Sequence, residues 1–171
     1  MDSSASDTGI TGEVLCLDVL IKVFEYLSTS DLLSMALVCK EWKKTVDCKS
    51  LWQGRHVCID PMRPFDLSFL GTFQQRGIQY VSLVATKCAR PSKTRLTYRL
   101  RAIMQCFTPT LRELTIQSMR LYSRDIYAVF SQKMECLEKL ELNNVKDANW
   151  SSFLRLSKQC PNLQHLNVKI L

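Results

Sequence analysis

Cysteine and histidine are the residue types in this sequence best suited to bind a metal or to act as nucleophiles. Eight cysteines and two histidines, His56 and His165, are spread over 171 residues, and no CxxC pair occurs. Because no grouping has the local ligand spacing of a zinc module, the sequence predicts no metal site. We expect the cysteines to be buried, reduced thiols that pack as small hydrophobic side chains.

Motifs for catalysis or nucleotide binding are not recognisable either. The five glycines do not form a glycine-rich phosphate loop, and neither histidine lies in a catalytic motif. We therefore expect a protein that is not an enzyme and needs no cofactor. A cysteine nucleophile is the alternative that the sequence leaves open.

Positive charge is concentrated in the middle of the chain, where residues 55–107 carry nine basic and two acidic side chains. Six basic residues lie within fifteen positions without an intervening acid: Lys87, Arg90, Lys93, Arg95, Arg99 and Arg101. Arginine forks suit phosphate and carboxylate oxygens, so an acidic or phosphorylated protein segment is one candidate ligand. Nucleic acid is an alternative, and a solvated helix face is another, since Arg95 and Arg99 form an exposed i, i+4 pair.

The overall composition is that of a soluble globular protein, with 46% hydrophobic and 23% charged residues. No apolar run approaches the roughly 18 residues of a membrane span. Residues 1–12 are polar, lack the features of a secretory signal and are expected to be a disordered tail. We expect the protein to be cytoplasmic, nuclear or both.

Residues 13–54 predict three short helices with more apolar surface than they can bury among themselves. In the first, an apolar stripe runs from Val19 to Leu27, and Ser28 begins a polar segment that can cap the second. The second helix, with its body at 32–39, has almost no polar face. Forty residues bury too little surface to cover these side chains, so a partner is implied.

These residues resemble an F-box almost end to end. The resemblance rests on four elements in the family's order, namely LCLDVLIKVFEYL at 15–27, DLL at 31–33, LVCKEW at 37–42 and SLW at 50–52. Cys16 stands where the family usually has proline. Loss of the fixed proline backbone is expected to weaken docking by about 0.5–1 kcal/mol without abolishing it.

Resemblance to the family implies a three-helix unit that binds the Skp-type adaptor of a cullin-RING ubiquitin ligase. The alternative for each apolar residue is that it only holds the three helices together. The adaptor contacts that the resemblance implies are Leu15, Cys16, Leu20, Val23, Phe24, Leu27, Leu32, Val38, Trp42, Leu51 and Trp52.

The second half of the chain repeats itself with a fixed period. Segments of the pattern LxxLxΦ, where Φ is aliphatic, begin at Leu111, Leu137 and Leu163, which are 26 residues apart. A constant period of this length is typical of leucine-rich repeats, each a strand followed by a helix. Residues 78–83 fit the pattern loosely 33 residues earlier, so 55–107 is interpreted as irregular first repeats with a basic insertion.

Residues 108–171 are interpreted as regular repeats, the last of them incomplete. Parallel stacking places residues 26 apart side by side, and the outward positions then form polar columns. Plain solvation of these columns is the alternative to substrate binding. The candidate substrate contacts are Glu113, Thr115, Gln117, Lys139, Glu141, Asn143, His165, Asn167 and Lys169, together with the six basic residues named above. Because no polar capping repeat follows Lys169, we expect a fragment, a short isoform or an end that a partner covers.

The sequence thus predicts an α/β protein, a three-helix F-box followed by a short leucine-rich-repeat solenoid with a parallel strand ladder and outer helices. The predicted function is substrate recognition in an SCF-type E3 ubiquitin ligase, leading to ubiquitination and proteasomal degradation of a bound protein. The alternative is a nucleic-acid-binding or scaffold protein that uses the basic stretch at 87–101.

Overall fold

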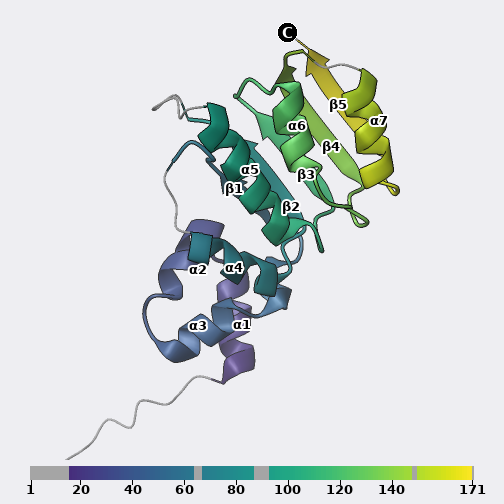
Figure 1. Cartoon of the computed structure of the whole chain (residues 1–171). Coiled ribbons are helices and arrows are strands. Elements are labelled where there is room, and N and C mark those ends of the chain that lie inside the picture. Colours follow the sequence, from purple (N-terminus) through teal and green to yellow (C-terminus); the bar gives the residue numbers. More distant parts are fainter. Residues whose placement is uncertain (1–15, 64–66, 87–92, 148–149, 171) are drawn as a thin grey trace, which may run out of the picture. The chain divides into compact units, whose positions relative to one another are not determined.

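The chain divides into two compact units, Met1–Val46 and Asp47–Leu171. The computed structural model (Figure 1) describes residues 16–63, 67–86, 93–147 and 150–170. The division falls after Val46, whereas sequence analysis ended the first module at residue 54. Residues 47–54 therefore belong to the second unit, and each unit is described by itself.

The first unit contains three short helices, α1 (Leu17–Glu25), α2 (Thr29–Met35) and α3 (Lys40–Val46). Both α1 and α2 pack against α3. The hydroxyl of Ser28 caps α2 as predicted, since its Oγ accepts a hydrogen bond from the backbone N–H of Asp31 at 3.2 Å.

Helix α2 ends at Met35, so the prediction of a helix body reaching Cys39 is wrong. The N–H of Leu37 donates to Ser34 and that of Val38 donates to Met35, which are tight three-residue turns rather than helical bonds. These turns redirect the chain into α3, which begins at Lys40, five residues after the end of α2.

The second unit is built on a five-stranded sheet in the order β1-β2-β3-β4-β5, with every neighbouring pair parallel. The strands are β1 (His56–Ile59), β2 (Tyr80–Val84), β3 (Glu113–Gln117), β4 (Lys139–Val145) and β5 (His165–Ile170). Glu113 pairs with Lys139, and Lys139 pairs with His165, so the predicted 26-residue register is confirmed. Tyr80 pairs with Glu113, as the 33-residue spacing from the loose first repeat predicts.

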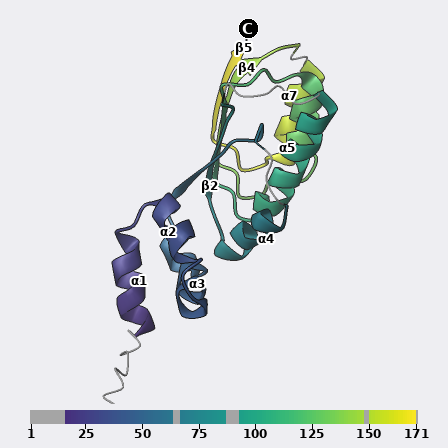
Figure 2. The same ribbon diagram turned by 90° about the vertical axis from the view of Figure 1, so that its left-hand side faces the viewer.

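Helices α4 (Leu67–Arg76), α5 (Lys93–Phe107), α6 (Ser123–Val129) and α7 (Trp150–Gln159) cover one face of this sheet, as Figure 2 shows. Alternate strand residues such as Leu114 and Ile116 are buried, and their neighbours face away from the helices. Apolar residues that alternate with polar ones thus make a one-sided sheet with its core under the helices.

Two of the outer helices bury residues on one side only. Helix α6 ends at Val129, and Met134 is buried in the loop that follows. In α7 the buried face includes Ser152 and Leu156, whereas Leu154 is 49% exposed.

A short 3₁₀ helix, η1 (Lys49–Trp52), precedes the sheet and places its two apolar side chains in the interior. Trp52 is 0% exposed and meets Phe73 of α4 edge to face, with 6.1 Å between ring centroids. Leu51 is also buried. These two side chains therefore belong to the core of the structure and not to the adaptor-contact surface on which the resemblance placed them.

The cysteines do not form the buried set that the sequence predicted. Among the described residues, Cys160 is buried, whereas Cys16, Cys39, Cys58 and Cys136 are exposed. Cys58 occupies an outward strand position, and Cys136 lies in the loop before β4, so neither reaches the core. No helix in the described part of the chain is long and apolar enough to cross a membrane.

Candidate partner-binding surfaces

An apolar surface runs along the outside of α1. Val19, Val23 and Tyr26 are exposed, Tyr26 to 90%, and they line a shallow groove of about 570 Å³. Asp18, Lys22 and Leu27 complete the lining of this groove. The α1 groove is open to solvent in the isolated chain, although exposing large apolar side chains to water is unfavourable.

The α1 groove exists because the apolar stripe of this helix is wider than the face that packs inside the unit. Leu20 and Phe24 point inward and are buried, while Val19 and Val23, one position earlier in each case, are exposed. Neighbouring helix positions are rotated by about 100°, so one edge of the stripe stays outside. Phe24 also packs edge to face on Trp42, with 5.4 Å between ring centroids.

The link between α2 and α3 exposes further apolar side chains. Leu37 is 86% exposed, and the neighbouring Val38 is also exposed. The helical pattern of the sequence did not predict that these two side chains are exposed. They are exposed because α2 ends early and leaves both residues in a turn. The first unit therefore has two exposed apolar segments, as the surplus of apolar residues predicts.

The residues predicted to contact an adaptor fall into different environments. Cys16, Val23 and Val38 are exposed, and Leu27 and Trp42 are half-buried. Leu20, Phe24 and Leu32 are buried, so their side chains serve packing, which was the alternative for each. Leu15 lies outside the described residues. The prediction missed the exposed side chains of Leu17, Val19, Tyr26 and Leu37.

The uncovered face of the sheet carries polar rows across the strands. One row joins His56, Tyr80, Glu113, Lys139 and His165 through successive strand pairs. The ammonium group of Lys139 lies 3.6 Å from the carboxylate of Glu113 and 3.5 Å from that of Glu141. These exposed pairs fix side-chain positions but add little stability, since surface ion pairs contribute about 0–1 kcal/mol.

The predicted columns are confirmed where the register pairs their members. Thr115 pairs with Glu141 and Glu141 with Asn167, while Asn143 pairs with Lys169. Gln117 pairs with Val84 of β2. Substrate binding by these residues stays a prediction.

Sequence analysis missed that both histidines lie in one row. The rings of His56 and Tyr80 are neighbours, with 5.0 Å between centroids. The row could have been predicted from the strand at 56–59, because each of its residues pairs with the residue 24 positions later in the sequence. Because the spacing between paired residues differs from one repeat to the next, a search for a fixed spacing does not detect this row.

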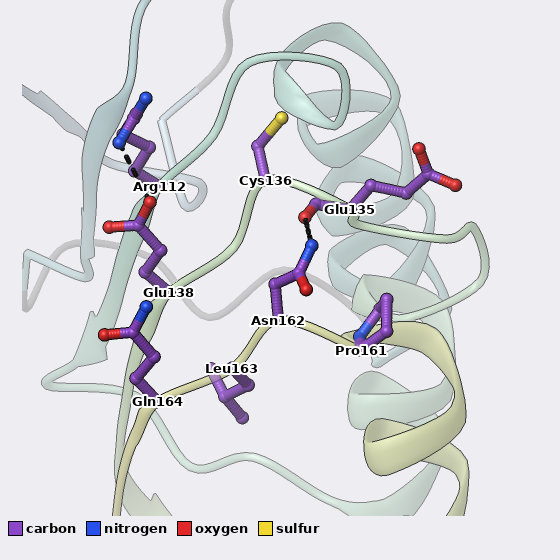
Figure 3. Close-up of a pocket in the computed structure, with 8 residues that line it drawn as sticks. All are labelled: Arg112, Glu135, Cys136, Glu138, Pro161, Asn162, Leu163 and Gln164. Atoms are coloured by element: carbon purple, nitrogen blue, oxygen red, sulfur yellow. Dashed lines mark hydrogen bonds and ion pairs between the residues drawn. The ribbon is translucent and has the colours of Figure 1, made fainter.

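A pocket of about 550 Å³ lies at the sheet edge, before β4 and β5 (Figure 3). Arg112 and Glu138 form an ion pair at 2.9 Å across it, and the amide nitrogen of Asn162 donates to the carbonyl of Glu135 at 2.7 Å. The charged side chains that line the pocket are thus paired, Arg112 with Glu138 and Glu135 with Lys133 at 2.8 Å. Its contacts join successive loops, which indicates a structural role.

Two side chains of the predicted basic stretch, those of Arg99 and Arg101, can be placed, and they lie in different surroundings. Lys87 and Arg90 lie outside the described residues, as do the side chains of Lys93 and Arg95 in α5. Arg99 donates from Nη1 to the carbonyl oxygens of Pro61 and Met62, at 3.1 and 3.0 Å, and so holds the loop after β1. Arg101 is exposed and lines a cleft with two arginines that sequence analysis did not single out, Arg124 and Arg155.

Metal-ligating groups do not converge in the parts of the chain that the structure describes, where no cluster of three or more such side chains occurs. The exposed apolar segments of the first unit, the polar strand face and the arginine cleft are the surfaces that can bind a partner.

Comparison with known proteins finds a similarity that is confined to the first part of the chain. Residues 17–58 match the family described as F-box-like. Over 46 residues the chain is 39% identical to F-box/LRR-repeat protein 12 of Bos taurus, an alignment that covers 27% of this chain and 14% of that protein. The chain thus matches a small part of the bovine protein's length. The mixed helix and parallel-strand structure carries an F-box-like domain at its N-terminal end, within residues 17–58.

Proposed function

We propose that this protein is the substrate-recognition subunit of an SCF-type E3 ubiquitin ligase. The observation that carries the proposal is the coincidence of two independent features over the same residues. Residues 17–58 match the F-box-like family, and the helices in that segment leave Val23, Tyr26 and Leu37 exposed. A domain of this kind with an uncovered apolar surface is suited to dock on a Skp-type adaptor.

The energetics favour a docked state. Burial of a large apolar side chain contributes about 1.5–3 kcal/mol, so a few side chains of the α1 groove are sufficient to stabilise a complex. Charged groups at the rim, such as Asp18 and Lys22, are suited to set the orientation of the partner. The proposed contact surface is the exposed half of α1 together with the α2–α3 link.

The second unit is proposed to hold the substrate. Its 26-residue register, parallel strands and one-sided helix layer support its interpretation as a short leucine-rich-repeat array. The name of the bovine relative also includes such repeats. The polar rows around Lys139 and the helix layer are then the two surfaces available to a protein substrate.

The proposed mechanism is positioning rather than chemistry. A receptor that holds an adaptor with one unit and a substrate with the other raises the effective concentration of a substrate lysine near a ubiquitin-charged enzyme. Ubiquitin transfer is then carried out by other subunits of the ligase. Ubiquitination of the bound protein, and its degradation, follow from this arrangement.

Co-purification with a Skp-type adaptor tests the adaptor side of the proposal. The informative variant is Val23→Asp combined with Val38→Asp, because both side chains are exposed and neither supports the core. Leu154→Asp is the matched control, since this residue of α7 is 49% exposed and lies in the other unit. We expect the wild type and the control to retain the adaptor and the double variant to lose it.

Two results would contradict the proposal. The wild-type chain, shown to be folded by circular dichroism, would fail to retain the adaptor at micromolar concentration. Alternatively, the double variant would retain it as well as the control does, which would show that the exposed side chains of α1 and of the α2–α3 link are not the contact surface.

A further inference from the structure

Three arginines from three successive helices face one cleft on the outer helix layer. Arg101 lies in α5, Arg124 in α6 and Arg155 in α7, and the cleft that they line has a volume of about 510 Å³. Figure 1 shows these helices side by side on the same face of the sheet. The other lining residues are Thr97, Tyr98, Tyr127 and Ala128, so no acidic side chain is part of the wall.

The charges of this arginine cleft are only partly neutralised from inside the protein. Among the described residues, Arg101 has no hydrogen-bond or ion-pair partner. Arg124 lies 3.8 Å from the carboxylate of Asp125, a long ion pair, and Arg155 donates from Nε to the carbonyl of Phe130 at 3.3 Å. The described residues thus engage only part of the hydrogen-bond donors of these three arginines.

Asp125 offsets only part of the positive charge at the cleft. Its side chain is 2% exposed and lies in the first turn of α6, where it accepts hydrogen bonds from the Thr97 hydroxyl at 2.7 Å and the Tyr122 N–H at 3.0 Å. A ligand in the cleft thus meets three cationic groups and one buried, already bonded carboxylate.

Neighbouring aromatic rings hold two of the guanidinium groups in place. The guanidinium carbon of Arg124 lies 5.3 Å from the centre of the Tyr122 ring, and that of Arg155 lies 5.3 Å from the centre of the Tyr127 ring. Arginine stacked on a ring presents its fork with less loss of side-chain entropy on binding. The arginine cleft is therefore partly organised before a ligand arrives.

Tyr127 adds a polar group to the same wall. Its hydroxyl is hydrogen-bonded to that of Ser151 at 3.0 Å. Hydrogen bonds with Ser151 and Ser152, helped by the charge of Arg155, lower the pKa of Tyr127 below its ordinary value. The two serine hydrogen bonds cause most of this shift, and the charge of Arg155 adds to it.

We propose that the arginine cleft binds a phosphorylated peptide segment of a protein ligand. Each phosphate carries about −1.5 to −2 charge and offers three acceptor oxygens, which suits three arginines that line one cleft. A nucleic-acid backbone spreads its charge evenly and favours a basic track along the surface. Three arginines around one cleft therefore fit concentrated phosphate charge better.

The proposal deepens the receptor function and rests on it for its biological meaning. It names the chemistry of the substrate segment, and it places recognition on the helix layer rather than on the polar strand face. Binding then depends on prior phosphorylation of the ligand, because the unmodified segment lacks the charges that the arginines neutralise.

Fluorescence anisotropy tests the arginine cleft directly. The probe is a fluorescein-labelled Gly-Ser peptide with two phosphoserines three residues apart, compared with the same peptide without phosphate. We expect Arg101→Gln to weaken binding of the phosphopeptide by about tenfold, the loss expected for one charged hydrogen bond. Arg155→Lys should weaken it less, because it keeps the charge and loses the fork.

Lys133→Gln is the matched control, because it removes one exposed positive charge from the loop after α6, outside the lining of the arginine cleft. It should bind the phosphopeptide as the wild type does. Equal losses in the control and in Arg101→Gln would show a nonspecific charge effect and overturn the proposal. Absence of wild-type binding up to millimolar peptide would overturn it as well.

A ten-residue oligothymidylate separates the nucleic-acid alternative, since tighter and steeply salt-dependent binding of this probe by the same arginines would also overturn the proposal. Adaptor co-purification with Arg101→Gln distinguishes the two levels of inference. The variant should retain the adaptor. Failure of the peptide experiment therefore does not contradict the proposed receptor function, and failure of adaptor capture does not contradict binding of the phosphopeptide.

Discussion

The guanidinium group of Arg76 lies 4.6 Å above the ring centre of Trp52. Its Nη2 also donates to the carboxylate of Asp47 at 2.9 Å, although the Arg76 side chain is only 3% exposed. A buried charge of this kind requires both its ionic partner and its polar contacts, because desolvation is costly. The interaction joins η1 and Asp47, which lies two residues before η1, to the end of α4.

Asp47→Ala is expected to destabilise the second unit by about 3 kcal/mol, because it leaves the buried charge of Arg76 without its partner. The value lies at the low end for a buried pair, since the Asp47 side chain is 23% exposed. Urea unfolding followed by tryptophan fluorescence measures the loss, and Trp52 beside Arg76 provides the signal.

The control for this prediction is Glu138→Ala, which removes the exposed ion pair with Arg112. Such a pair contributes about 0–1 kcal/mol, so this variant should unfold close to the wild type. Equal stability of the Asp47 and Glu138 variants would show that burial does not strengthen the Arg76 pair.

Repeat spacing was the most informative part of the sequence. A ladder of parallel strands forces residues one period apart to pair, so the 26-residue spacing predicted the contacts of Lys139 with Glu113 and the pairing of Lys139 with His165. The prediction was possible because the backbone alone sets this register. It extended to Tyr80 because the 33-residue spacing was visible as well.

The orientation of α1 could not be predicted in the same way. Its apolar stripe covers about 140° of the helix, more than the one face that packs inside the unit. Leu20 and Phe24 are buried while Val19 and Val23 are exposed, and periodicity alone does not distinguish these halves. Trp52 was misplaced for a related reason, since its neighbours Phe73 and Arg76 lie far ahead in the sequence.

The arginine cleft escaped sequence analysis because its members are far apart. Arg101, Arg124 and Arg155 are separated by 23 and 31 residues, and only the stacking of α5, α6 and α7 brings them together. Sequence analysis grouped Arg99 with Arg101 because they are two residues apart. In the structure Arg101 lines the cleft, whereas Arg99 donates to backbone carbonyls of a loop. Charge density along the chain is therefore a weak guide to charge density on the surface.

Phe24→Ala should weaken the first unit rather than its contact surface. Phe24 is 2% exposed, and truncation of a buried phenylalanine costs about 3–5 kcal/mol through lost burial and the cavity left behind. Val23→Asp, at an exposed neighbouring position, should change the free energy of unfolding by about 0.5 kcal/mol or less. Thermal unfolding followed by circular dichroism compares the two variants.

The two variants also separate stability from binding. If Val23 contacts the adaptor, its substitution weakens capture while the chain stays folded, whereas Phe24→Ala weakens capture only as far as it unfolds the unit. A loss of stability in Val23→Asp as large as that in Phe24→Ala would contradict the exposed position of Val23.

Cysteine reactivity should follow exposure. Burial raises the pKa of the Cys160 thiol to about 12, and it also raises the pKa of Cys106 above its ordinary value. The thiolate is the reactive form, so at about pH 8 Cys160 should resist iodoacetamide in the folded protein. Cys16, Cys39, Cys58 and Cys136 are exposed and should be alkylated first.

Peptide mass spectrometry after timed alkylation ranks the sites. Unfolding in urea is the control, because it should make Cys160 react as fast as the exposed cysteines. Rapid modification of Cys160 under native conditions, at the rate of Cys136, would contradict its buried position.

Asp60 should make the stability of the second unit dependent on acid pH. Burial alone would raise the pKa of Asp60, but hydrogen bonds from the Thr86 side chain and from the N–H groups of Met62 and Thr86 lower it below 3.8. A carboxyl group with a depressed folded-state pKa stabilises the protein above its unfolded pKa. That contribution is lost as pH falls through the lower, folded-state pKa.

The wild type should therefore exceed Asp60→Asn in free energy of unfolding at about pH 6, and the difference should shrink toward zero near about pH 2. Urea unfolding at both pH values measures this. Thr86→Val removes the hydroxyl that donates to Asp60, so an NMR titration of this variant should show the Asp60 pKa shifted up toward its ordinary value. A difference in free energy of unfolding between wild type and Asp60→Asn that is constant from about pH 2 to about pH 6 would contradict the prediction, because it would show that the surrounding loop does not stabilise the ionised form of Asp60.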